Sequence, residues 1–129
     1  MKILKSLFVI VVALGIGVNV AAKKSSTSAD DLAIKLHLGV TNYLDGLKQD
    51  TQTTPKNVQL LFAHMHLDTI INTPNAPKIN IKAWLVAHCY LGMMYYYGHG
   101  VSQDYAQAFA HFNDVINPIH NAQKNITDV

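Results

Sequence analysis

Residues 81–112 read IKAWLVAHCYLGMMYYYGHGVSQDYAQAFAHF, and this stretch decides the fold. Apolar side chains recur at helical spacing from Ile81 to Tyr97 and again after Ser102, a residue type that caps helices. Between the two runs stand Gly98-His99-Gly100, and glycine readily takes the left-handed conformation in which helices end. We therefore predict two helices that reverse at these glycines. The second should end at Pro118, because proline lacks the amide hydrogen that a helix needs.

The same stretch carries a spaced set of small, aromatic and glycine residues. They are Ala87, Leu91, Gly92, Tyr95, Gly98, Gly100, Val101, Asp104, Ala108 and Phe112. Their order closely resembles one Sel-one-like repeat, a relative of the tetratricopeptide repeat in which each unit is an antiparallel helix pair. The resemblance covers residues 83–117. It departs from the family at His111, where a tryptophan is common, and at Val115 and Ile116, where paired alanines are common.

Elementary chemistry agrees with this pattern. Ala87 and Gly92 lack bulk, so a neighbouring helix can approach closely there, while Leu91 and Tyr95 fill the space between the two helices. Val101 can close the base of the pair, and Asp104 is expected in the first turn of the next helix. The departures at Val115 and Ile116 make a further standard repeat after this pair hard to stack. The pair is therefore expected to be the last.

A weaker copy of the pattern stands upstream. Residues 38–46 echo residues 91–98 in their Leu-Gly, Tyr and Gly order with one residue inserted, and Phe62-Ala63-His64 echoes Phe109-Ala110-His111. Apolar periodicity predicts helices over about 30–47, capped by Ser28 or Asp30, and from after Pro55 to Ile71. Residues 76–80 should be a connector. The first pair is a divergent repeat or a cap, since one repeat cannot bury its faces alone.

The predicted fold is therefore all-α, a short α-solenoid of about four helices in antiparallel pairs. A flexible leader at 23–28 precedes a helical repeat domain at 29–118, in which 29–73 is the divergent or capping pair and 81–117 the Sel-one-like repeat. Residues 119–129 should form a frayed tail, with a short helical turn as the alternative.

The first 22 residues have the pattern of a secretory signal peptide. Lys2 and Lys5 precede an apolar run from Leu7 to Val18, and Val20-Ala21-Ala22 offers small residues for cleavage. An uncleaved anchor is the alternative, but it needs roughly 20 apolar residues. We expect cleavage near Ala22, no stable membrane anchor afterwards, and a periplasmic or secreted protein of a bacterium.

Composition argues against several functions. Cleavage would remove two of the ten lysines and leave eight against eight aspartates, so the net charge falls to zero. Without a basic face no nucleic-acid partner is expected. The chain has no Glu for a carboxylate pair, and Cys89, the single cysteine, is adjacent in sequence to His88 but turned from it around the helix. We predict no catalytic residues. Cys89 is either a buried small hydrophobe, or a reactive or intermolecular thiol.

Seven histidines raise the question of a metal. No two of them lie four residues apart on a helix, which is the spacing that places two ligands on one face. We therefore expect no metal site and no cofactor. Their number suggests a response to acid, because histidine gains its charge near pH 6.5.

The helix at 81–97 has two apolar sides. Trp84, Ala87, Leu91 and Tyr95 form one ridge, assigned to packing; Val86, Tyr90, Met93 and Tyr97 form a second. The second ridge is either covered by the first two helices or binds a partner, for which Tyr and Met are well suited. We predict partner binding at these four residues.

The function expected from these observations is protein–protein interaction by an exported helical-repeat adaptor or scaffold, as the resemblance implies, with another protein as its partner. An alternative is an envelope protein that binds a small ligand or a metal through histidines and an apolar pocket. A third possibility is a chain that completes a repeat array in another protein.

Overall fold

The computed structural model describes residues 26–49 and 57–127, with the side chains of these up to residue 121. This part of the chain is all-helical, as predicted, and holds α3 (Ala29–Lys48), α4 (Val58–Ile71), α5 (Ala76–Ile79), α6 (Ile81–Tyr97) and α7 (Tyr105–Thr127). The predicted signal peptide, residues 1–22, lies outside the described residues.

The first helix starts at a reciprocal cap. The Ser28 hydroxyl accepts a hydrogen bond from the Asp31 amide at 3.1 Å, and the Asp31 carboxylate accepts one from the Ser28 amide at 2.9 Å. Of the two predicted caps, the structure selects Ser28, because its side chain reaches the orphan amide three residues on. Asn57 caps α4 in the same way through the Leu60 amide.

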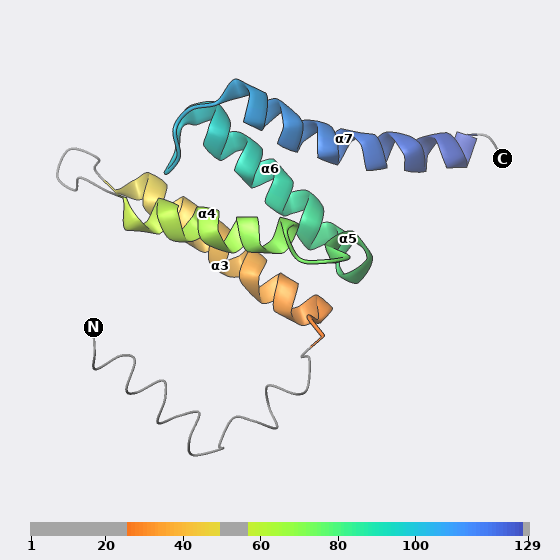
Figure 1. The fold of residues 1–129 in the computed structure, drawn as a ribbon, viewed down its shortest axis with the longest axis horizontal. Helices are drawn as coiled ribbons and strands as arrows, with labels where there is room; N and C mark the ends of the chain where they lie inside the picture. Colours follow the sequence, from red (N-terminus) through yellow and green to blue (C-terminus); the bar gives the residue numbers. More distant parts are fainter. Residues whose placement is uncertain (1–25, 50–56, 128–129) are drawn as a thin grey trace, which may run out of the picture.

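Glycines bring α3 and α4 close together as an antiparallel pair (Figure 1). A Cβ added at Gly39 would lie 2.9 Å from the side chain of Leu67, and one added at Gly46 would lie 2.7 Å from that of Leu60. Both contacts are tighter than a real Cβ tolerates. Two glycines seven residues apart therefore accept two leucines seven residues apart on the facing helix.

The segment at 76–80, expected to be a connector, contains the single turn α5 before α6 begins. Asn80 caps α6 by accepting a hydrogen bond from the Ala83 amide at 3.0 Å. Its side-chain amide donates to the Ala29 carbonyl, also at 3.0 Å. The start of α6 is thereby attached to the start of α3.

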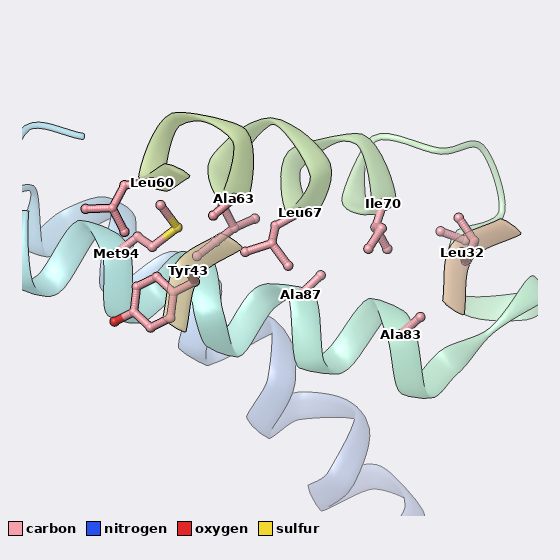
Figure 2. Close-up of a cluster of buried hydrophobic side chains, with 11 residues drawn as sticks. Leu32, Tyr43, Leu60, Ala63, Leu67, Ile70, Ala83, Ala87 and Met94 are labelled. Atoms are coloured by element: carbon pink, nitrogen blue, oxygen red, sulfur yellow. The ribbon is translucent and has the colours of Figure 1, made fainter. Parts of the chain in front are cut away.

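The core lies where α6 crosses the α3–α4 pair. Figure 2 shows side chains of α4 directed at the small residues of α6, with Tyr43 and Leu32 contributed by α3. Ala87 and Leu91 are completely buried. Small residues on α6 let it approach α4 closely, so this helix joins the first pair to the second.

The reversal after α6 forms as predicted. Gly98 ends the helix with φ of 70°, and Gly100 follows with φ of 74°. The helix that follows begins later than expected, at Tyr105, and Asp104 caps it in place of Ser102. The Asp104 carboxylate accepts hydrogen bonds from the amides of Ala106 and Gln107 at 2.9 and 3.0 Å. Asp104 therefore precedes the first turn.

The predicted end of the last helix at Pro118 is wrong. Pro118 lies inside α7, which continues to Thr127, so most of the expected frayed tail is helical. Because proline has no amide hydrogen, the hydrogen bond from residue 118 to the Asp114 carbonyl is missing. Asp114 is exposed, so water can satisfy this carbonyl, and residues 119–127 contain no glycine or further proline. The helical unit accordingly extends past residue 118.

Candidate protein-binding surface

The predicted partner-binding ridge divides into two parts in the structure. Val86 and Tyr90 are half-buried, and Tyr90 packs edge-on against Tyr43 of α3, with ring centroids 5.4 Å apart. The Tyr43 hydroxyl in turn lies 3.0 Å from Nδ1 of His99 in the reversal. Tyr90 is thus engaged within the fold; Met93 is also half-buried, and Tyr97 is the exposed member of the ridge.

Met93 and Tyr97 border a hollow near the C-terminal end of α6. Met93 and Tyr97 of the predicted ridge line it together with Tyr96 and Phe112, and its volume is about 240 Å³. Tyr97 is 59% exposed. The structure therefore brings two of the four predicted residues to one concave site and places Val86 and Tyr90 outside its lining.

Tyr96 and Phe112 were not predicted as binding residues. The sequence pattern placed Phe112 in the repeat motif and left Tyr96 between two ridges. The available signal was the reversal itself, because an antiparallel pair places the end of one helix beside the start of the next. Reading α6 alone could not reveal a surface shared by two helices.

The aromatic residues around the hollow contact one another. The Tyr96 ring lies 4.9 Å from that of Tyr97 and 5.3 Å from that of Tyr105, and Tyr97 stacks on His99 at 5.3 Å. The Gln103 side chain donates hydrogen bonds to the Tyr96 carbonyl and the Tyr105 hydroxyl. These contacts restrict the rings before any partner arrives, which lowers the entropy cost of binding.

The repeat-motif residues occupy structural positions. A Cβ added at Gly92 would lie 2.5 Å from the Phe112 ring, so α6 and α7 meet at this glycine. Ala108 is buried, and Val101 packs against the core. The Asp104 amide donates to the Tyr95 carbonyl at 2.9 Å, which fixes the start of α7 against the end of α6.

A second cluster, of histidines, lies on the other side of α6. Nδ1 of His88 is 3.0 Å from Nδ1 of His111 on α7 and 3.7 Å from the Asp114 carboxylate. Trp84 packs edge-on against the His88 ring, and Tyr95 stacks on the His111 ring. The Tyr95 hydroxyl lies 3.2 Å from Nε2 of His64 on α4. The cluster therefore joins three helices.

Burial governs the charge of this cluster. Desolvation lowers the pKa of His88 below its usual value; His111 lowers this pKa further, and Asp114 opposes the shift. Desolvation also lowers the pKa of His111, against the opposing charges of Asp114 and Asp68. Within the described residues, no three His, Cys, Asp or Glu side chains converge as a metal would require.

Cys89 is half-buried on α6. Burial raises the pKa of its thiol, and a protonated thiol is a poor nucleophile. Its neighbour His88 is engaged with His111, so the two do not form a thiol–base pair.

No helix in the described ranges is both long enough and apolar enough to cross a bilayer. Comparison with family models, with curated proteins and with solved structures finds no match to this chain.

Proposed function

We propose that this chain is an exported adaptor that binds a helical or extended segment of another protein at the hollow lined by Met93, Tyr96, Tyr97 and Phe112. The observation that carries the proposal is a concave site lined by three aromatic side chains and one Met side chain. Tyr, Phe and Met are enriched at protein interfaces relative to the rest of the surface. Cleavage near Ala22 and release into the periplasm or medium remain part of this proposal.

The proposed architecture is a short solenoid of Sel-one-like type, in which α3–α4 is a divergent repeat of α6–α7. Each pair has a glycine in its first helix that accepts a large side chain of its second, Leu67 at Gly39 and Phe112 at Gly92. A buried alanine stands four residues before each of these side chains, Ala63 and Ala108. This parallel supports a common design for the two pairs.

The parallel also changes the register in which the two pairs are compared. The sequence echo of Phe62-Ala63-His64 with Phe109-Ala110-His111 sets Ala63 against Ala110, yet Ala63 is buried and Ala110 is exposed. Burial instead sets Ala63 against Ala108. The change is two residues, which is more than half a helical turn and would move a different face into the core.

The size of the hollow favours a protein partner over a small ligand. Enclosing a small molecule takes about 300 Å³ or more, and this hollow offers about 240 Å³. A side chain or two of a partner would fill it. The histidine cluster does not support the metal alternative, because no three His, Cys, Asp or Glu side chains of the described residues converge there as metal ligands would.

The test compares two double variants in capture from the cell envelope of the source organism. Met93→Ala with Tyr97→Ala removes apolar side chains that line the hollow, and Val58→Ala with Leu61→Ala removes exposed apolar side chains from α4, where these residues are 50% and 47% exposed. We expect one protein to be retained by the parent and the α4 variant and lost by the hollow variant. The identified partner should then bind the hollow variant at least about tenfold more weakly by calorimetry, as removal of an aromatic anchor commonly does.

Equal retention of this partner by all three proteins would contradict the proposed site. Circular dichroism of each variant provides the control for folding. Tyr97, Val58 and Leu61 are exposed and Met93 is half-buried, and all four are replaced by a strong helix former.

A further inference from the structure

One side of α7 carries an apolar stripe that the described helices cover only in part: Phe112 is half-buried where it meets Gly92 of α6, and the Tyr105 ring contacts that of Tyr96. We define the α7 stripe as Tyr105, Phe109, Phe112, Ile116 and Ile119. Phe109 is 71% exposed, and Tyr105, Ile116 and Ile119 are 61%, 60% and 54% exposed. Among the described helices, only α6 makes extensive contact with α7, whose C-terminal part projects past the others (Figure 1).

The spacing along the α7 stripe is that of a helix–helix seam. Successive members are separated by four, three, four and three residues. This alternation keeps one narrow line of side chains facing a second helix that runs alongside, as in a coiled coil. A curved or globular partner surface would not demand so regular a line, so the stripe fits another helix lengthwise.

The charges on α7 favour an identical helix as the occupant. The positions that flank the α7 stripe on its open side are Ala106, Asn113 and His120, and they include no Asp, Glu, Lys or Arg. Asp114 lies on the side that faces His88. The stripe thus offers a foreign charged helix no complementary group, whereas a second copy meets no like charge directly opposite.

The area agrees with a pair of modest affinity. At these exposures the uncovered aromatic and Ile side chains offer on the order of 100 Å² each, so two copies would bury roughly 800 Å² from them alone. Phe112 and the flanking positions extend this toward the ~1,200 Å² at the lower end of specific interfaces. Closed twofold pairing is also the commonest form of self-association.

We propose that the α7 stripe is the self-association surface of this protein, and that α7 of a second copy lies along it in a twofold dimer. The dimer does not depend on the adaptor function proposed above, because the α7 stripe shares only Phe112 with the hollow.

The test is the mass in solution of protein expressed from the full chain, with its N terminus read by mass spectrometry. Sedimentation velocity between about 1 and 100 µM spans the affinities that an interface of this size supports. We expect the parent to shift from one to two copies across this range. Phe109→Asp with Ile116→Asp should remain monomeric, with at least a tenfold loss of affinity and unchanged helix content by circular dichroism.

The matched control is Ala110→Asp with Asn117→Asp, which adds the same two carboxylates to exposed positions on the opposite side of α7. It should dimerise as the parent does. A monomeric parent, assemblies larger than two copies, or equal loss of dimer in both double variants would each overturn the proposal. A monomeric parent that co-sediments with phosphatidylethanolamine–phosphatidylglycerol vesicles would assign the α7 stripe to a lipid surface. None of these results bears on the Met93 and Tyr97 test of the hollow.

Discussion

Gly92 sets the distance between α6 and α7, because the Phe112 ring occupies the space that a Cβ would need. Gly92→Ala adds that Cβ. Alanine gains up to about 1 kcal/mol in helix propensity, but overpacking costs about 1–3 kcal/mol, so we expect a net loss of about 1 kcal/mol in the free energy of unfolding. Chemical denaturation measures this change.

Phe112→Leu provides the partner substitution for a double-mutant cycle. In that background the smaller side chain relieves the clash, so Gly92→Ala should become neutral or stabilising. If the effect of Gly92→Ala has the same sign and size in both backgrounds, the Phe112 contact is not what makes glycine necessary.

His88 should make stability depend on pH. Its pKa is lowered on folding, so the unfolded chain takes up a proton first as the pH falls below about 6.5. The contribution of His88 to the free energy of unfolding is therefore complete above that pH. It decreases as the pH falls, until the pH has passed the folded-state pKa. Asp114, Asp68 and His64 face the same cluster and modulate the effect.

Urea denaturation between pH 7.5 and 5, a range chosen to bracket the histidine pKa, tests this expectation. His88→Gln should flatten the slope, whereas His37→Gln, at an exposed position on α3, should leave it as in the parent. A parent whose stability is constant or rises over this range would show that folding does not hold these histidines neutral.

Among the elements, α7 departs most from expectation, because the local rule for proline did not hold at Pro118. Pro118→Ala restores an amide donor to an existing helix. Since proline costs about 3 kcal/mol relative to alanine in a helix interior, we expect slower amide exchange in residues 119–127 and a higher unfolding temperature. Asn117→Ala, at the exposed neighbouring position, should gain only about 0.5 kcal/mol. Equal protection of these amides in both variants would show that proline does not limit this end of α7.

Helix ends were readable from sequence where one residue determines them. Gly98 ends α6 as predicted, and Ser28, one of the two caps predicted, starts α3, because a left-handed turn and an amide cap are local needs. Ser102 was wrong as a cap because two side chains, those of Ser102 and Asp104, compete for the same role. The Asp104 amide is already engaged by the Tyr95 carbonyl, a contact from the previous helix that local sequence does not reveal.

For the whole molecule, the sequence predicted the all-helical class and two helices that reverse at glycines, but only part of the candidate site. Helical periodicity shows that α6 has two apolar sides, yet it cannot show which side a neighbour covers. Tyr90 is covered because Tyr43, 47 positions earlier, packs on its ring. Phe112 joins Met93 at the hollow for the same reason, since their proximity arises only when the two helices are placed together.

Leu60 contacts both helix pairs of the molecule. Its side chain fills the space at Gly46, and a Cβ at Gly100 would lie 2.7 Å from it. One leucine thus packs between the two helices of the first pair and also contacts the loop of the second pair. A helix pair added by gene duplication would therefore need a glycine loop that packs against a leucine of the preceding pair. It would also need its own leucine near the start of its second helix, so that a further pair could follow.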